Sequence, residues 1–140
     1  MSNTAKKAED GRPPMLLGVS TVRVFVSDLR RALEFYTGPL ALRVSATDDS
    51  SWVLFRLSNA GLLIESVSGA SGESREHKEL VGRFTGVSFD TDDIQRAFDE
   101  LSALGVRFEG PPERQFWGGT LAHFYDSAGN VLTLVERAKS

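Results

Sequence analysis

The 140-residue chain contains no cysteine, only two histidines, and no run of apolar residues long enough to cross a membrane. The lack of cysteine excludes both a disulfide framework and a thiolate metal site, and the reducing cytoplasm is therefore the expected location. The net charge of −3 provides no basic surface for nucleic acid or an anionic membrane, so we expect neither as a partner. Apolar residues make up 41% of the chain and charged residues 25%, which is typical of one globular domain with a single core.

The chain is organised around two similar halves. Residues 1–14 are polar and predict a flexible N-terminal tail rather than a secretory signal. Residues 15–140 form the predicted domain, with a first module over about 17–67 and a second over about 83–137. The intervening residues, 68–82, are polar, rich in glycine and without hydrophobic periodicity, so we interpret them as a linker, which leaves open a role as a lid.

Two short motifs occur in both halves. Residues 27–34, SDLRRALE, recur as residues 92–99, DDIQRAFD, and residues 59–65, NAGLLIE, recur as residues 127–133, SAGNVLT. The first motif begins with an acidic N-cap and continues with helical spacing, whereas the second is a hairpin turn that leads into a strand. Each module is therefore predicted to be βαβββ. The predicted fold class is α+β, with two such modules forming a curved mixed sheet around a cavity and the helices on the outer face.

The helix ends and the strand faces follow from the same pattern. The first helix should end near residues 37–39, and the second at Gly105, because glycine readily adopts the left-handed conformation of a C-cap. In the first strand Val24 alternates with Arg23 and Phe25. The all-apolar side of each strand should lie under a helix, and the polar side should line the cavity or, alternatively, form a solvated outer face.

The order of these motifs resembles the vicinal-oxygen-chelate superfamily, which includes glyoxalases, bleomycin-resistance proteins and extradiol dioxygenases. The resemblance runs from about residue 17 to 136 and rests on four segments: 26–36 (VSDLRRALEFY), 92–94 (DDI), 117–119 (WGG) and 124–131 (FYDSAGNV). It implies a homodimer, because domains of this family commonly pair.

The resemblance also identifies where a metal ion would bind. Metal-dependent members hold the ion with four side chains, mostly histidine and glutamate, on the first and last strands of each module. The corresponding positions here are Thr21, Glu65, Gly86 and Thr133. Of these only Glu65 is a strong ligand, since glycine has no side chain and threonine is a poor donor to such ions. We therefore predict neither a metal nor another cofactor, and the chain looks most like the metal-free bleomycin-resistance proteins.

Six residues are candidates for binding a ligand, because they lie on the polar strand faces or in aromatic segments: Arg23, Trp52, Arg56, Glu65, Trp117 and His123. Trp117 precedes two glycines, where a ligand or another backbone can approach closely. The carboxylate of Glu65 requires a partner, with Arg23 or Arg56 available. Such a pair would be structural, whereas a free Glu65 carboxylate would bind a ligand amine or act as a base.

The function we predict is metal-independent binding of an aromatic or cationic small molecule, by sequestration, as in bleomycin-resistance proteins. The alternative is a lyase or isomerase of the glyoxalase type, with Glu65 as base and His123 as acid, and with no metal or a degenerate metal site. A third possibility is a regulatory or structural member whose pocket is filled by its own side chains.

Overall fold

The computed structural model of the chain describes residues 9–68 and 77–138. The first part of the expected tail, residues 1–8, and most of the expected linker, residues 69–76, lie outside the described residues. Within the described ranges, no helix has the length and apolar character that a membrane span requires.

The first module contains one helix and four strands. They are β1 (Thr21–Val26), α1 (Leu29–Thr37), β2 (Ala46–Thr47), β3 (Trp52–Arg56) and β4 (Gly61–Ser66). The strands form a sheet in the order β1-β4-β3-β2, in which β1 and β4 are parallel and the other pairs are antiparallel. This is the βαβββ arrangement predicted from the sequence.

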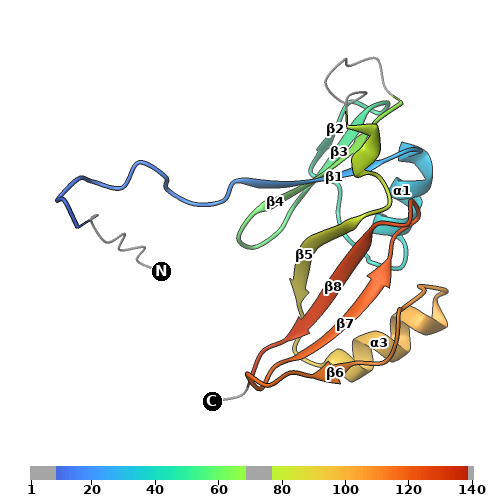
Figure 1. The fold of residues 1–140 in the computed structure, drawn as a ribbon. Helices are drawn as coiled ribbons and strands as arrows, with labels where there is room; N and C mark the ends of the chain where they lie inside the picture. Colours follow the sequence, from blue (N-terminus) through green and yellow to red (C-terminus); the bar gives the residue numbers. More distant parts are fainter. Residues whose placement is uncertain (1–8, 69–76, 139–140) are drawn as a thin grey trace.

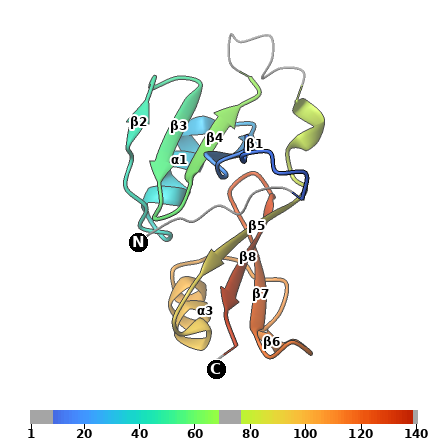
Figure 2. The same cartoon turned by 90° about the vertical axis from the view of Figure 1, so that its left-hand side faces the viewer.

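The second module repeats the first after a short 3₁₀ helix, η1 (Lys78–Leu80). Its elements are β5 (Phe84–Asp90), α3 (Ile94–Ala103), β6 (Glu113–Arg114), β7 (Thr120–Tyr125) and β8 (Val131–Glu136), and its sheet has the order β5-β8-β7-β6. The predicted α+β class is therefore confirmed. The two mixed sheets are separate and do not close into one barrel within a single chain (Figures 1 and 2).

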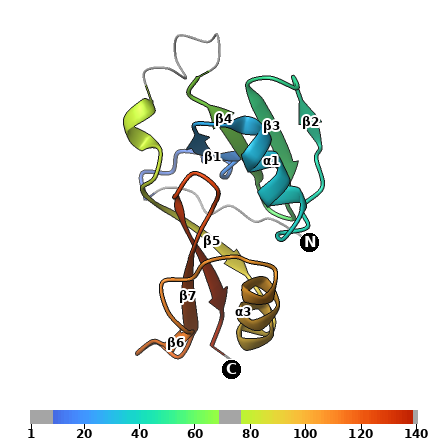
Figure 3. The ribbon, with the colours of Figure 1, turned by 90° about the vertical axis from the view of Figure 1, so that its right-hand side faces the viewer.

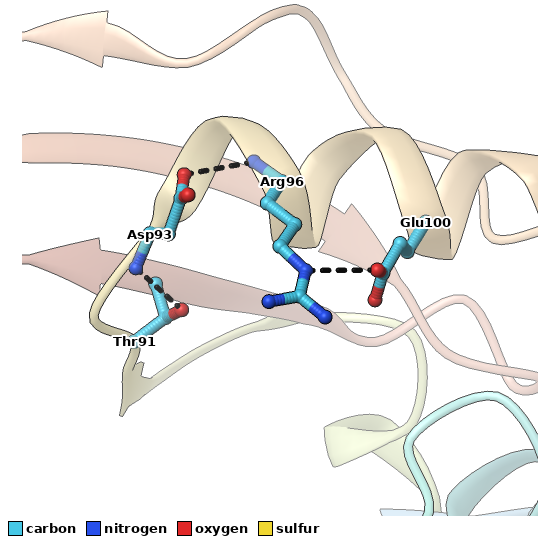
Figure 4. Close-up of polar contacts among 4 residues, drawn as sticks. All are labelled: Thr91, Asp93, Arg96 and Glu100. Atoms are coloured by element: carbon cyan, nitrogen blue, oxygen red, sulfur yellow. Dashed lines mark hydrogen bonds and ion pairs between the residues drawn. The ribbon is translucent and has the colours of Figure 1, made fainter.

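Both helices begin at an aspartate, as the repeated motif predicts. The carboxylates of Asp28 and Asp93 each accept a hydrogen bond from the backbone N–H three residues later, at 3.2 and 3.0 Å. At α3 the backbone N–H of Asp93 also donates to the Thr91 hydroxyl, and Arg96 pairs with Glu100 one turn further on (Figure 4). The hydrogen bonds accepted by the two aspartates satisfy backbone N–H groups that a helix leaves without a partner at its start.

The helices also end where the sequence indicated. Helix α1 stops at Thr37 and is capped by Gly38, whose N–H donates to the carbonyl of Glu34. Helix α3 is followed by Gly105, which has the positive φ of 92° that favours glycine at this position. Each α-helix packs on one face of its own sheet (Figure 3), and the 3₁₀ helix η1 contacts β1.

The helix-covered faces of both sheets form one hydrophobic core. Most of the strand residues predicted to lie under the helices are buried, for example Val24 (1% exposed) and Leu132 (fully buried), whereas Val87 and Phe89 are partly buried. Phe25, which the alternation places on the opposite face, is nevertheless only 5% exposed. The ring of His77 covers it at a centroid distance of 4.8 Å.

A buried polar network joins the two modules. The Tyr36 hydroxyl on α1 donates to Asp126 at 2.7 Å, and the Asn130 amide donates to the same carboxylate at 3.0 Å. Asn130 also donates to the Phe25 carbonyl of β1 and accepts from the Gly82 N–H, both at 2.8 Å. Burial and the adjacent Asp126 carboxylate raise the pKa of Tyr36 well above its ordinary value. Asp126 and Asn130 therefore connect helix α1, strand β1 and the start of the second module.

Candidate ligand-binding site

The open face of the first sheet carries an ion pair between two adjacent strands. Arg23 on β1 donates to Glu65 on β4 through Nε at 2.6 Å and through Nη2 at 3.2 Å. The two residues are diagonal neighbours, because the parallel register places Glu65 opposite Phe25. The Glu65 side chain is 13% exposed and that of Arg23 is 41% exposed. Of the two arginines considered from the sequence, Arg23 is thus the one that pairs with Glu65 in this bidentate geometry.

Aromatic groups surround this ion pair. Trp52 on β3 lies directly across from Glu65 and is half-buried. The Arg23 guanidinium lies over the Phe25 ring, 5.3 Å from its centroid, where a cation is attracted to the ring face. Arg56 ends β3 on the same open face and is exposed. We call the group Arg23, Trp52, Arg56 and Glu65 the first half-site.

The open face of the second sheet carries a histidine that is fixed in place by a threonine. His123 on β7 is the cross-strand partner of Thr133 on β8, and its Nδ1 is hydrogen-bonded to the Thr133 hydroxyl at 2.7 Å. The Thr133 side chain is buried, whereas His123 is partly exposed. The Phe84 ring meets the imidazole edge-on at a centroid distance of 5.7 Å. The hydrogen bond and the ring contact together restrict the orientation of the imidazole.

A small cavity of about 210 Å³ opens beside His123. Its acidic side is formed by Glu109 and Glu113, and its remaining lining comes from the same loop and from β7: Gly110, Pro111, Gln115, Leu121 and Ala122. Glu109 also accepts a hydrogen bond from the Tyr125 hydroxyl at 3.3 Å. We call the group Phe84, Glu109, Glu113 and His123 the second half-site. Its two carboxylates and its ring face favour a cationic or aromatic group.

Trp117 lies at the edge of the second sheet, in the turn between β6 and β7. Its ring packs on Gly119, where an added Cβ would lie 1.8 Å from the ring. The glycine that was expected to admit a ligand or another backbone thus accommodates the Trp117 side chain itself. The ring remains 46% exposed, and the neighbouring Phe116 is fully exposed. The turn therefore presents two aromatic rings to the surroundings.

The structure places the six predicted residues on two different sheets. Arg23, Trp52, Arg56 and Glu65 belong to the first sheet, whereas Trp117 and His123 belong to the second or to its turn. A larger cavity of about 390 Å³ lies between the modules and is lined by none of the six. Its lining is mostly aliphatic and aromatic, including Leu57, Leu101 and Phe124, so we regard it as a gap beside the core.

The four positions at which the resemblance implies metal ligands do not fit a divalent ion. Glu65 already engages both of its oxygens with Arg23, and the Thr133 hydroxyl is bonded to His123. Gly86 has no side chain and lies at a register shift in β5 with a φ of 78°. Within residues 9–68 and 77–138, no three side chains of histidine, cysteine, aspartate or glutamate gather into a possible metal group.

Sequence reasoning missed several residues of the two half-sites. Glu109 and Glu113 lie in a loop and in a two-residue strand, where no alternation indicates a side-chain direction. Phe84 is the first residue of its strand, and His77 lies within the segment that the sequence predicted as a linker. Only the folded chain brings Phe84 onto His123 and His77 onto Phe25, because these contacts join different elements.

Comparison with known proteins identifies the family of this chain. The model of the Glyoxalase/Bleomycin resistance protein/Dioxygenase superfamily matches residues 18–134 of this chain. The chain belongs to this superfamily. The match covers both modules, so the resemblance drawn from the motifs is confirmed.

Solved structures of the superfamily have the same fold. A member from Sphaerobacter thermophilus is 28% identical, with a TM-score of 0.72 over 89% of this chain and all of that one. TnmS3, an antibiotic binding protein from Streptomyces sp. CB03234, is 23% identical, with a TM-score of 0.71 over 90% of this chain and all of its own. Lactoylglutathione lyase from Agrobacterium tumefaciens is 21% identical, with a TM-score of 0.69 over 89% of this chain and 95% of its own. A binding protein and an enzyme thus share this fold, so the fold alone does not select a function.

Proposed function

We propose that this superfamily member binds a small organic molecule without a metal ion and holds it rather than converting it. The observation that carries this proposal is the bidentate Arg23–Glu65 pair. Glu65 is the only strong donor among the four positions at which the resemblance implies metal ligands, and Arg23 neutralises its charge. A ligand is then held by side-chain contacts, as expected of the bleomycin-resistance branch.

The ligand is an aromatic compound that carries a positive charge. The carboxylates of Glu109 and Glu113 line the cavity beside His123, and the Phe84 ring provides an aromatic face next to it. Carboxylates attract the cation, and aromatic rings favour a flat partner. The similarity in fold to TnmS3, an antibiotic binding protein, is consistent with this class of ligand.

The pocket is completed by a second copy of the chain. The cavity beside His123, at about 210 Å³, is smaller than the roughly 300 Å³ at which drug-sized pockets begin. The first half-site lies on a separate sheet of the same chain, and its two arginines, Arg23 and Arg56, are exposed. In a homodimer the first half-site of one copy faces the second half-site of the other, which encloses the ligand between ion pair and carboxylates.

Binding is favoured over the glyoxalase-like chemistry because of the environments of Glu65 and His123. A general base needs an oxygen that reaches the substrate proton, but both oxygens of Glu65 accept from Arg23. His123 uses Nδ1 in its contact with Thr133, which leaves Nε2 for a ligand. This arrangement is suited to recognition through hydrogen bonds and charge.

Thermal unfolding in the presence of a matched set of compounds tests this proposal. The set contains an aromatic cation, its neutral isostere and its anionic isostere, each added with a chelator present. We expect only the cation to raise the melting temperature, because a ligand bound only by the folded state stabilises it. Replacing Glu113 with glutamine should weaken its binding at least about tenfold, equivalent to about 1.4 kcal/mol.

The matched control is Glu100→Gln on α3, which lies outside both half-sites and should leave the affinity unchanged. Stabilisation that requires an added metal ion, or conversion of the compound into a product, would overturn the proposal. Equal stabilisation by all three isosteres would instead disprove the assigned charge of the ligand.

A further inference from the structure

In the second half-site, His123 lies between two carboxylates along strand β7. The backbone N–H of Glu109 donates to the His123 carbonyl at 2.9 Å, and the Glu109 carboxylate accepts from the hydroxyl of Tyr125, two residues further along the strand. Glu113 is the cross-strand partner of Leu121, two residues away in the other direction. The cavity beside His123 thus contains two charged acceptors with an imidazole between them.

The hydroxyl of Thr133 determines which nitrogen of the imidazole carries the proton. Thr133 is 3% exposed, so its hydroxyl needs an acceptor within the protein. Among the described residues, the one hydrogen-bond partner of this hydroxyl is His123 Nδ1, at 2.7 Å. We therefore assign the hydroxyl as the donor and Nδ1 as the acceptor. A proton on Nδ1 would leave the hydroxyl hydrogen buried without an acceptor, which costs free energy.

This assignment makes Nε2 the donor of the imidazole. A neutral imidazole carries one hydrogen, which lies on Nε2 when Nδ1 accepts. Within residues 9–68 and 77–138, Nε2 has no hydrogen-bond partner. The ring is partly exposed and lines the cavity, and the edge-on contact with Phe84 restricts its rotation. His123 therefore presents an oriented N–H donor in a cavity whose charged groups are acceptors.

We propose that His123 recognises a hydrogen-bond acceptor on the ligand through Nε2–H, and that Thr133 fixes this donor. The inference rests on the aromatic cation of the proposed function and adds a second group to it, a carbonyl or ether oxygen. The oxygen is neutral, because a carboxylate would be repelled by Glu109 and Glu113. A ligand without the oxygen leaves Nε2–H unpaired in the cavity and binds less tightly.

The positions of the carboxylates indicate where the oxygen lies relative to the charge. Glu109 is engaged by the Tyr125 hydroxyl, so Glu113 is the carboxylate that we assign to the cation. Glu113 faces Leu121, and residues two apart on a strand are separated by about 7 Å. The charge and the oxygen of the ligand therefore belong at opposite ends of one aromatic ring.

Three compounds of similar shape test the proposal by isothermal titration calorimetry. The cation para-acetylphenyltrimethylammonium has both groups, para-ethylphenyltrimethylammonium lacks the oxygen, and para-tert-butylacetophenone lacks the charge. We expect the acetyl cation to bind the full chain at least about tenfold more tightly than the ethyl cation, equivalent to about 1.4 kcal/mol.

Variants of Thr133 test its role in fixing the donor. Thr133→Val keeps the branched shape but releases Nδ1, so the ring can rotate or move its proton, and the advantage of the acetyl cation should fall below about threefold. Thr133→Ser retains a hydroxyl and should retain the advantage. The control is Thr37→Val at the end of α1, which removes a threonine hydroxyl outside both half-sites and should leave both affinities unchanged. Far-ultraviolet circular dichroism should show that the variants remain folded.

Nitrogen NMR of the isotope-labelled chain observes the proton directly, because protonated and unprotonated imidazole nitrogens give different chemical shifts. The chain has two histidines, and His77→Gln assigns their signals. At neutral pH we expect His123 to have an unprotonated Nδ1 and a protonated Nε2. The Nε2 signal should shift on addition of the acetyl cation more than on addition of the ethyl cation.

The outcomes separate this inference from the proposed function. Equal binding of the two cations, or a proton on Nδ1 of His123, overturns the inference and leaves the proposed binding of a cation intact. Equal losses in Thr133→Val and Thr133→Ser overturn the role of the hydroxyl. If para-tert-butylacetophenone binds as tightly as the acetyl cation, the charge assigned in the proposed function is wrong and the acceptor stands. Failure of all three compounds to bind overturns both.

Discussion

The two partners of the Arg23–Glu65 pair differ in exposure. We therefore expect the removal of each one to lower the free energy of unfolding by a different amount. The Glu65 side chain is 13% exposed and the Arg23 side chain is 41% exposed. Glu65→Gln leaves an arginine that reaches water and still has one amide oxygen as an acceptor. Arg23→Met leaves a carboxylate that is largely withdrawn from water. Burying an unpaired charge is what makes a broken ion pair costly, so the second variant should lose more stability.

The expected losses of stability lie between those known for exposed ion pairs and those known for fully buried ion pairs. Exposed ion pairs are worth up to about 1 kcal/mol, and breaking a fully buried pair costs about 3–5 kcal/mol. We therefore expect Glu65→Gln to lower the free energy of unfolding by about 1 kcal/mol, and Arg23→Met to lower it by about 2–3 kcal/mol. Glu100→Gln, which breaks the exposed Arg96–Glu100 pair, is the matched control and should cost less than about 0.5 kcal/mol.

Urea unfolding at neutral pH measures these differences, with the double variant Glu65→Gln and Arg23→Met closing the cycle. The double variant should be more stable than Arg23→Met alone, because it no longer contains an unpaired carboxylate. Equal costs for the two single variants, or a larger cost for Glu65→Gln, would refute the reasoning from exposure.

Three further predictions concern pH and metal content. The Ser51 hydroxyl, with backbone N–H groups of the same turn, lowers the pKa of Asp48 below its ordinary 3.8, so its stabilisation is present above that value and is lost as the pH falls below it. The melting temperature of Asp48→Asn should thus be lower than that of the natural chain at pH 7, with a smaller difference at pH 2. The raised pKa of Tyr36 means that stabilisation is present below its ordinary 10.0 and is lost as the pH rises through the folded value. Tyr36→Phe should cost about 2 kcal/mol at pH 8, because buried Asp126 loses a donor, and less at pH 11. Elemental analysis of the purified protein should find less than about 0.1 equivalent of transition metal, and stoichiometric metal would contradict the ligand assignment.

The fold was predictable from the sequence because its determinants are local. Aspartate N-caps, a glycine C-cap and alternating strand residues each act over a few positions, and all were found where expected. The duplication supported the prediction of two βαβββ modules, because two weak motifs that recur in the same order indicate one repeated unit. The shift of register in β5 was not predicted. It lies between Phe84 and Ser88 and includes Gly86, which has a φ of 78°. A bulge depends on the partner strand, which a single segment does not specify.

The site was less predictable because its contacts join residues that are distant in the sequence. Alternation placed His123 on the polar face of its strand, opposite the buried Ala122, but it did not show which arginine would pair with Glu65. That choice depends on the parallel register of β1 and β4, which places Arg23 diagonally across from Glu65. Nothing in the sequence indicated that the Trp117 ring would pack on Gly119.

The positions at which the resemblance implies metal ligands are occupied differently in the two modules, and this bears on how a ligand is held. In the first module the remaining carboxylate is neutralised by Arg23, and in the second the Thr133 hydroxyl is used to hold His123. Each polar group is therefore satisfied within its own sheet. A metal ion that binds residues of both sheets would fix their separation, whereas these contacts do not. Within one chain, the relative position of the two half-sites is then set by the buried Asp126–Asn130 network, which joins the two modules.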